Sequence, residues 1–326
     1  MIDYRKYSHI DDYDAYKRFC EKSFGNNCYQ SKIDHIEWLE SNKYHFINLA
    51  VLDSEIIGCF HGFKAPVKIN NETQFFYSLH DLMVDKKYGT QIGFKLMQDV
   101  IFQDNPVILS GAIGRISRAY KRLGSTQFKS HWYRKFIIPY NPLRFFFLNK
   151  NFIKLTQNKM KLNFINNKEE DSRIIIESII NAYEYDDDFS REFFEWRYFQ
   201  TNSPLTFFTY DDSFKNIIKF SIGLRGFIPF LRIISVIKDN DKIFLHLLRS
   251  IEDFASRIGI PVILYSITED ILPPKELKFN EYKDIPNSFV FSKKRNLLNN
   301  FSIVINGFST DLGFDSLFYK GINEQN

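Results

Sequence analysis

The sequence LHDLMVDKKYGTQIGFKLM, residues 79–97 of the 326-residue chain, decides the fold. It begins with an apolar run that predicts a strand, passes through a short turn at Gly89, and then predicts an amphipathic helix. The apolar residues of that helix recur at helical spacing: Ile92, Leu96 and Val100. The first N–H groups of a helix lack partners within it and carry the positive end of its dipole, so this junction suits a phosphate or pyrophosphate. Lys86 and Lys87 add full positive charges at its edge.

The same segment resembles the acyl-coenzyme A loop of the GNAT acyltransferase superfamily, whose pattern is a strand, then Arg/Gln-x-x-Gly-x-Gly/Ala, then a helix. Here Tyr88 stands where the family has Arg or Gln, Gln91 stands in place of the central Gly, and Gly93 remains. The resemblance implies an acyl-CoA co-substrate. The residues that it implies for coenzyme binding are Leu82, Met83, Val84, Tyr88, Gly89, Thr90, Gln91, Ile92 and Gly93. The other interpretation is a strand–turn–helix packing unit whose glycine serves only the turn.

The neighbouring segments extend the resemblance over roughly residues 1–140. Strands are predicted at residues 46–53, 55–63, 75–84, 106–111 and 127–138. Residues 116–123 predict a short helix that stops at Gly124. GNAT domains place Tyr-x-x-Leu-Gly-Phe at the end of this helix, and the chain has Tyr120 to Ser125 there, with serine in place of phenylalanine. The resemblance implies an α/β (α+β) fold in which a mixed, mostly antiparallel sheet is flanked by helices.

The second half of the chain repeats this order loosely. We therefore expect two GNAT-like modules, residues 1–150 and 151–326, joined by a Lys- and Asn-rich stretch at 149–171. Helices are predicted at residues 172–183, 189–198 and 242–257, and strands at 205–210, 216–223, 227–238 and 261–266. The strand-to-helix junction at residues 237–242 has no glycine, and its two aspartates would repel a pyrophosphate. We expect this degenerate module to shape the acceptor pocket and not to bind coenzyme A.

One helix of the second module carries candidate acceptor-binding residues. It resembles a signature, with an arginine ahead of Trp-Arg-Tyr, of bacterial two-module GNAT proteins that are associated with surface-polysaccharide synthesis. The residues that it implies are Arg191, Trp196, Arg197 and Tyr198. Arginine suits bidentate contacts with phosphate. The helical spacing of the aromatic residues also predicts an amphipathic helix whose aromatics are simply core.

Amide formation from a thioester needs a group that takes a proton from the amine and a group that protonates the leaving thiolate. Strand alternation predicts that Ser78, His80, Leu82 and Val84 share one face and that Asp81 points the other way. His80 is the candidate base, because imidazole titrates near neutrality, and Asp81 is expected to orient a neighbouring group or to cap the sheet edge. The family resemblance implies that Tyr120 is the acid. The alternatives are a hydrogen-bonded core histidine and a tyrosine that packs on the sheet.

Composition narrows the classes of partner. The net charge is +4, and no run of like charges is long enough for a nucleic-acid arm. The three cysteines lack metal-ligand spacing, so we expect no metal and a reduced, cytoplasmic setting. Acidic residues interrupt the N-terminus, so no signal peptide is expected. The apolar stretches at 143–148 and 227–237 are too short to span a bilayer, although contact of residues 145–147 with a membrane surface stays open.

The resemblance to the GNAT superfamily implies an acyl-CoA-dependent N-acyltransferase. We expect it to move an acetyl or short (hydroxy)acyl group onto the amine of a nucleotide-linked amino-deoxy sugar for surface-polysaccharide (lipopolysaccharide) synthesis, as a monomer or weak dimer. That acceptor is implied by the resemblance and the two-module layout. The alternatives are a GNAT or FemAB-like transferase acting on a peptide or amino-acid amine, and a non-catalytic protein that binds a coenzyme or nucleotide.

Overall fold

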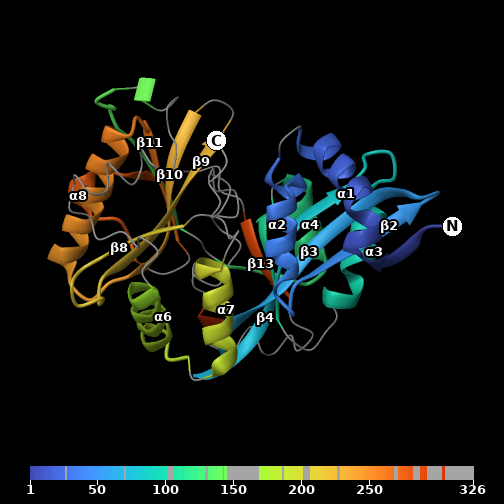
Figure 1. Ribbon diagram of the computed structural model, residues 1–326, viewed down its shortest axis with the longest axis horizontal. Helices are drawn as coiled ribbons and strands as arrows, with labels where there is room; N and C mark the ends of the chain where they lie inside the picture. The colour runs from blue at the N-terminus through green and yellow to red at the C-terminus, as the bar shows by residue number, and fades with distance from the viewer. Residues whose placement is uncertain are drawn as a thin grey trace. The chain divides into compact units, whose positions relative to one another are not determined.

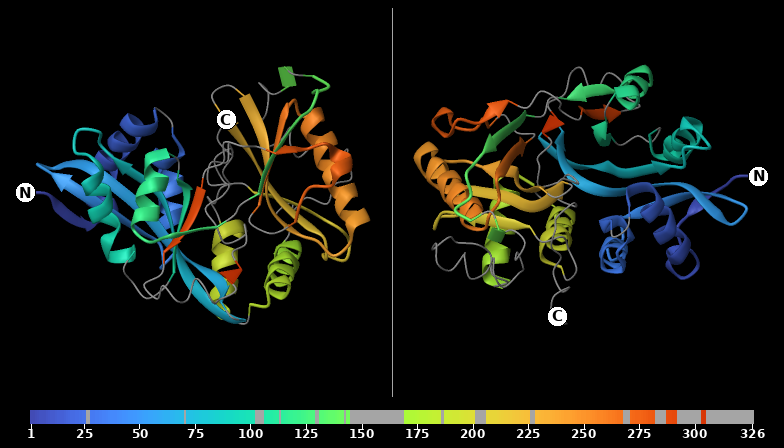
Figure 2. Two further views of the ribbon diagram at one scale, coloured as in Figure 1. Left: turned by 180° about the vertical axis from the view of Figure 1, so that it is seen from behind. Right: turned by 90° about the horizontal axis from the view of Figure 1, so that it is seen from above.

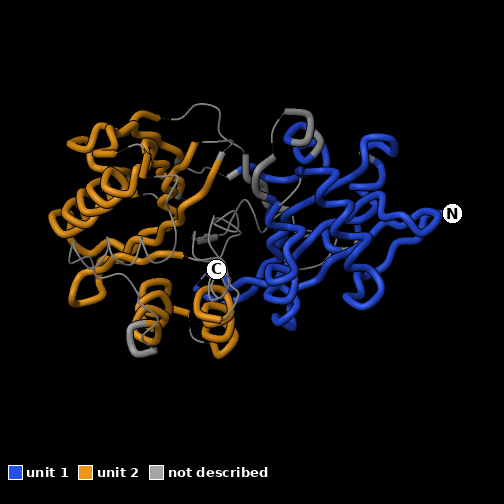
Figure 3. The backbone as a smooth tube through the Cα atoms, turned by 45° about the horizontal axis from the view of Figure 1, so that its top comes forward, with its two compact units in different colours: residues 1–128, 286–303 blue, residues 129–285, 304–326 orange. Residues whose placement is uncertain are grey.

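The computed structural model describes residues 1–25, 28–69, 71–101, 106–112, 114–128, 131–141, 143–144, 169–185, 187–200, 206–225, 228–267, 271–281, 287–291 and 303–304 (Figure 1). The chain forms two compact units (Figure 3). The first comprises residues 1–128 and 286–303, and the second comprises residues 129–285 and 304–326. Among the described residues, no helix combines the length and the apolar character that crossing a membrane requires.

The first unit is built on one mixed sheet with the order β1-β2-β3-β4-β5-β13-β6, and β14 pairs with β3. Its strands are β1 (Asp3–Lys6), β2 (Phe46–Leu52), β3 (Glu55–Ile69), β4 (Glu72–Val84), β5 (Val107–Ala112), β6 (Thr126–Phe128), β13 (Asn287–Phe291) and β14 (Ile303–Val304). Strand β4 pairs with β3 antiparallel and with β5 parallel. The helices are α1 (His9–Phe24), η1 (Tyr29–Ser31), α2 (Ile33–Glu40), α3 (Thr90–Ile101) and α4 (Gly114–Arg122).

Helices cover both faces of this sheet (Figure 2). On one face, Ile92 and Leu96 of α3 pack against Phe60 of β3, and α4 adds Tyr120 to the same core. On the other face, α1 and α2 pack against a core that includes Cys59, the strand neighbour of Phe60. Successive strand residues point to opposite faces, so one strand supplies apolar side chains to two cores.

The second unit holds another mixed sheet with the order β12-β7-β11-β10-β9-β8. Its strands are β7 (His131–Phe136), β8 (Phe207–Tyr210), β9 (Ile217–Arg225), β10 (Ile228–Ile237), β11 (Val262–Ile267) and β12 (Asn280–Glu281). Its helices are α6 (Glu169–Ala182), α7 (Asp188–Phe199), α8 (Asp241–Arg257) and η3 (Lys275–Leu277). Strands β10 and β11 are parallel, as β4 and β5 are in the first unit, and α8 buries its apolar face against this sheet.

Two features differ from the expected layout. The single strand predicted at residues 127–138 is two strands in different sheets: β6 pairs with β13 in the first unit, and β7 pairs with β11 in the second. Strand β13, from the C-terminal part of the chain, lies beside β5 in the first sheet. The units therefore divide after Phe128, ahead of the boundary expected at 149–171, because the β7–β11 ladder places β7 with the second sheet. Most of that expected linker lies outside the described residues, as do residues 145–147.

Gly62 of β3 marks a close approach in the first core. A Cβ built there would lie 2.7 Å from Cδ2 of Leu79 and would also clash with the Phe46 ring. We expect Gly62→Ala to lower the free energy of unfolding by about 1–3 kcal/mol, as overpacked cores do. Urea denaturation measures this change, with the exposed Gln74→Ala as the control. A variant as stable as wild type would show that the core relaxes without strain.

Asp12 anchors the start of α1 to β1. Its carboxylate accepts two hydrogen bonds of 2.6 Å from Arg5 and one of 2.8 Å from the Ser8 N–H. The Arg5 bonds lower the pKa of Asp12, although burial opposes them. A carboxylate with a lowered pKa stabilises the fold above the pKa of its unfolded form, about 3.9, and loses that contribution as the pH falls further. We expect Asp12→Asn to be less stable than wild type at pH 7 and the difference to shrink below about pH 4. The exposed Asp14→Asn, measured by the same denaturation series, should show no such trend.

Candidate active site

The two parallel strands at the centre of the first sheet separate part of the way along. Strands β4 and β5 pair only from Tyr77 with Val107 to Leu79 with Leu109. Beyond those pairs β4 continues to Val84, while β5 continues beside β13. In the described part of the chain no ladder pair joins β4 to β5 past Leu79. We call this interval, in which residues 80–84 have no ladder partner on β5, the gap. An extended ligand that carries amide groups can hydrogen-bond to such an edge.

The gap ends at the turn before α3. The Asp85 N–H donates to the Ile57 carbonyl at 2.8 Å, and the Tyr88 N–H donates to the Asp85 carbonyl at 2.9 Å. Gly89 has a φ of +76°, a conformation that favours glycine. A Cβ built at Gly89 would have no other heavy atom within 4 Å, so this side of the turn is open. A Cβ built at Gly93 would lie 3.2 Å from Cγ2 of Val84. The exposed Lys86 and Lys87 adjoin this turn. The predicted anion-binding junction therefore has the expected local geometry: a tight glycine turn that leads into the N-terminus of a twelve-residue helix.

A β-bulge at Asp81 changes the expected faces of β4. Cys59 pairs with Met83 and His61 with His80, so β4 has one more residue than β3 in this interval. Asp81 absorbs the extra residue with a φ of +50°. The alternation resets there: Met83 packs on the α1 side, whereas the side chains of Leu82 and Val84 pack on the α3 side. The prediction that His80, Leu82 and Val84 share one face is therefore wrong.

The bulge also turns Asp81 toward His80, contrary to the expectation that the two point apart. Nδ1 of His80 lies 3.0 Å from Oδ2 of Asp81. Tyr29 and Gln30 of η1 donate to Oδ1 of the same carboxylate at 3.1 and 3.0 Å. Burial raises the pKa of Asp81, but the hydrogen bonds from His80 and Gln30 outweigh it and hold the pKa well below its usual range. Asp81 is therefore an ionised carboxylate that orients the His80 ring.

The rings of two further histidines lie next to the ring of His80. We call the three residues, His45, His61 and His80, the histidine cluster. The ring centroid of His80 lies 5.2 Å from that of His61 and 6.1 Å from that of His45. The Tyr16 hydroxyl lies 2.6 Å from Nε2 of His61. Burial lowers the pKa of His61 to about 3 and that of His45 well below its usual value. Sequence reasoning missed His45, His61 and Tyr16, because they come from segments that only the tertiary fold brings together.

Tyr120, the predicted acid, lies on the other face of the sheet. It is 6% exposed and belongs to the core formed with α3. Burial raises the pKa of Tyr120 to about 12, so its hydroxyl holds its proton at neutral pH. His80 and Tyr120 thus lie on opposite faces of the first sheet. A group that lies in the gap between β4 and β5 borders both faces.

The predicted acceptor residues lie on α7 of the second unit. Arg191 is exposed and pairs with Glu177. The others are buried: Trp196, Arg197 and Tyr198. The Tyr198 hydroxyl accepts a hydrogen bond of 2.6 Å from the buried Lys219. The aromatic side chains of α7 therefore serve the core of this unit, which is the alternative that the helical spacing left open.

The strand-to-helix junction of the second unit is closed by its own side chains. Oδ1 of Asn240 accepts from the N–H groups of Lys242 and Ile243 at the start of α8. Oδ1 of Asn216 accepts from the N–H groups of Asp239 and Asn240. Because these N–H groups already donate to asparagine side chains, they are not available to bind a phosphate.

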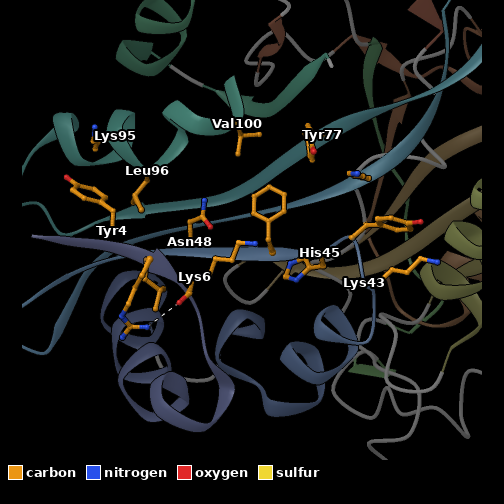
Figure 4. Close-up of a pocket in the computed structure, with 14 residues that line it drawn as sticks. Tyr4, Lys6, Lys43, His45, Asn48, Tyr77, Lys95, Leu96 and Val100 are labelled. Atoms are coloured by element: carbon orange, nitrogen blue, oxygen red, sulfur yellow. Dashed lines mark hydrogen bonds between the residues drawn. The ribbon is translucent and has the colours of Figure 1, made fainter. Parts of the chain in front are cut away.

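A cavity of about 550 Å³ lies within the first unit, between α3 and the first strands of the sheet (Figure 4). Lys95, Leu96 and Val100 of α3 line one side. The other cationic residues that line it are Arg5, Lys6, Lys43 and Lys64, and the aromatic ones are Tyr4, Tyr44, Phe46 and Tyr77. His45 also lines this cavity. The cavity therefore suits an anionic ligand with a ring, and it adjoins the histidine cluster.

Solved structures of GCN5-related N-acetyltransferases have a similar fold. No family model and no curated protein sequence matches the chain. A GCN5-related N-acetyltransferase from Kribbella flavida matches with a TM-score of 0.54 and 12% identity, over 89% of this chain and 70% of that chain. Another from Anabaena variabilis has a TM-score of 0.53 and 14% identity, over 89% and 72%. The Saccharomyces cerevisiae N-myristoyltransferase with bound myristoyl-CoA has a TM-score of 0.57 and 10% identity, over 89% and 78%. At these identities the likeness shows the fold, and it confirms the predicted fold class.

Proposed function

We propose that the protein is an acyl-CoA-dependent N-acyltransferase. The observation that carries this proposal is that β4 has no ladder partner on β5 past Leu79, within the described residues, and continues to the glycine turn and the N-terminus of α3. A coenzyme has both parts that such a site needs: an amide-bearing pantetheine for the edge and a pyrophosphate for the helix N-terminus. The yeast structure of similar fold holds an acyl-CoA, which supports the same class of co-substrate here.

In the proposed reaction the acyl thioester lies in the gap and the acceptor amine approaches from the side of the histidine cluster. The Asp81 carboxylate holds Nδ1 of His80, so the ring takes the amine's proton at Nε2. Backbone N–H groups along residues 82–84 polarise the thioester carbonyl as its oxygen gains charge. The Tyr120 hydroxyl, on the opposite face, protonates the departing thiolate of coenzyme A. The new amide bond replaces the thioester bond, and the products are the amide and free coenzyme A. His80 then gives its proton to solvent and Tyr120 takes one back, which restores the starting state.

The acceptor that we propose is the amine of a nucleotide-linked amino-deoxy sugar. The cationic and aromatic lining of the 550 Å³ cavity supports this choice, because it suits phosphates and a base. The cavity adjoins His45, whose ring neighbours that of His80, so the sugar end of such a ligand lies toward the proposed base. We also propose that the second unit takes part in acceptor binding and that the enzyme acts in surface-polysaccharide synthesis.

Calorimetry and product analysis test the proposal in two steps. We expect acetyl-CoA to bind to the full chain with one site, since the junction in the second unit is capped. Mass spectrometry of reactions with acetyl-CoA or a hydroxyacyl-CoA and a panel of nucleotide amino sugars, peptides and amino acids should then show acylation of one amine class. Binding without turnover on any amine would identify a coenzyme-binding protein, and the absence of binding would contradict the proposal altogether.

A further inference from the structure

We propose that His45, His61 and His80 form a binding site for a divalent metal ion of the zinc class, which goes beyond the acyltransferase function proposed above. Each of the three side chains offers one ring nitrogen, and these three atoms all lie within 4.8 Å of one another. His45 lies directly before β2, His61 in β3 and His80 in β4. No short spacing in the sequence therefore indicates a metal site. Three imidazoles with one open position form a known zinc-binding arrangement.

The rings have almost the spacing that zinc requires. Their centroids are 5.2, 5.5 and 6.1 Å apart. Tetrahedral zinc with bonds of about 2.1 Å places imidazole centroids about 5 Å apart and their ligating nitrogens about 3.4 Å apart. Small rotations of the rings about their side-chain bonds bring the nitrogens from the present separation to the bonded one. The backbone is already fixed by the β3–β4 ladder, in which His61 pairs directly with His80.

Two ring nitrogens of the cluster already have hydrogen-bond partners, which leaves the opposite nitrogen of each of those two rings for a metal ion. Nδ1 of His80 donates to the Asp81 carboxylate, which Tyr29 and Gln30 hold in place. Nε2 of His61 is 2.6 Å from the Tyr16 hydroxyl. Metal-ligating histidines typically donate their other N–H to a carboxylate, hydroxyl or carbonyl, which fixes the tautomer and orients the ring. Asp81 and Tyr16 supply these contacts here.

A bound ion also satisfies polar atoms that are otherwise costly to bury. Within the described residues, Nε2 of His45 and Nδ1 of His61 are buried and have no hydrogen-bond partner. His61 is fully buried. Buried polar atoms of this kind are rare and ask for an explanation. A metal ion that accepts the lone pairs of these two nitrogens meets that need directly.

The ion can enter and can keep a fourth ligand. His45 belongs both to the cluster and to the lining of the 550 Å³ cavity, and this is the route by which the proposed ion enters. The cationic residues around that cavity favour an anion, such as hydroxide or a carboxylate, at the open position of the metal. Imidazole ligands suit zinc, copper and nickel and not magnesium or calcium. An ion bound through His80 occupies the nitrogen that takes the amine's proton, so metal binding and the proposed acyl transfer exclude each other at this residue.

Cobalt and zinc titrations test the site without any coenzyme or acceptor, so the result does not depend on the acyltransferase proposal. Tag-free full-length protein is stripped with a chelator and titrated with Co²⁺. We expect one equivalent to bind with the visible absorption bands of tetrahedral Co²⁺ and to be displaced by Zn²⁺. His45→Gln and His61→Asn should each weaken binding at least 100-fold. Asp81→Asn, which keeps a hydrogen-bonding side chain that tolerates the positive φ, should weaken it about 10–100-fold.

His246→Gln is the matched control, because His246 is exposed on α8 in the second unit. Its affinity should equal that of wild type. Circular dichroism and thermal melts of the apo proteins show whether each variant is folded. Folded His45→Gln and His61→Asn with unchanged affinity would overturn the proposal. If neither variant folds, the wild-type titration decides: no tetrahedral Co²⁺ bands at one equivalent would overturn the proposal just as firmly.

Discussion

We expect His80→Ala to slow acyl transfer by about 100-fold while leaving the affinity for acyl-CoA unchanged, since general base catalysis contributes about that much or more. His80 lies at the bulge of β4, and the ionised Asp81 orients its ring. Removal of the ring leaves the amine to lose its proton to water. The measurement is the steady-state rate of coenzyme A release in the presence of a chelator, so that no metal occupies the histidine cluster, together with calorimetry of acetyl-CoA binding.

The Tyr120→Phe variant extends this test to the opposite face of the sheet. It keeps the ring that packs in the α3 core and removes the hydroxyl proton, so we expect a rate loss similar in size to that of His80→Ala with little change in melting temperature. A rate equal to that of wild type in folded His80→Ala would show that His80 is structural and that water or another group takes the proton. The same result for Tyr120→Phe would remove the tyrosine alone from the mechanism.

A negative charge at the start of α3 should weaken coenzyme binding well over tenfold. Gly93→Asp places a carboxylate in the first turn of α3, where the N–H groups and the helix dipole are proposed to hold the pyrophosphate. Gly89→Asp adds the same charge at the open side of the turn and also strains a residue with a φ of +76°. Calorimetry with acetyl-CoA measures both effects.

Gly93→Asn is the matched control, because asparagine has the size of aspartate without its charge. At Gly93 a side chain meets Cγ2 of Val84 at 3.2 Å, so part of the loss is steric. We expect Gly93→Asn to bind more tightly than Gly93→Asp, and the gap to narrow as salt screens the charge. Equal, wild-type affinity in folded Gly89→Asp and Gly93→Asp would place the coenzyme elsewhere.

The order of elements in the first unit could be predicted from sequence because its signals are local. The period of Ile92, Leu96 and Val100 predicted α3, and Gly89 predicted the turn before it. In the second unit the predicted helix at residues 242–257 matches α8 almost to the residue. Capping, periodicity and turn chemistry act over a few residues, so a single sequence carries them.

The candidate site was predicted only in part. His80 and Asp81 were chosen, but simple alternation placed them on opposite faces, whereas the bulge brings Asp81 to 3.0 Å from the His80 ring. Nothing in the sequence around residue 81 marks that bulge, because a positive φ at an aspartate is imposed by the pairing with β3. The partners of the site, His45 and Tyr16, belong to segments far from β4 in the sequence, and their proximity has no local signal.

The sequence by itself therefore determined the helices, most of the strands and the glycine turn that the coenzyme proposal rests on, because each depends on residues a few positions apart. Only the tertiary structure decided which sheet each strand joins. Strand β7 follows the strands of the first unit in the sequence but pairs with β11 in the second sheet, and β13, from the C-terminal part of the chain, pairs with β5 in the first sheet. It also decided the bulge at Asp81 and the assembly of the histidine cluster. Strand pairing and side-chain clusters join residues that are distant in sequence, so their energies depend on the whole fold and not on any one segment.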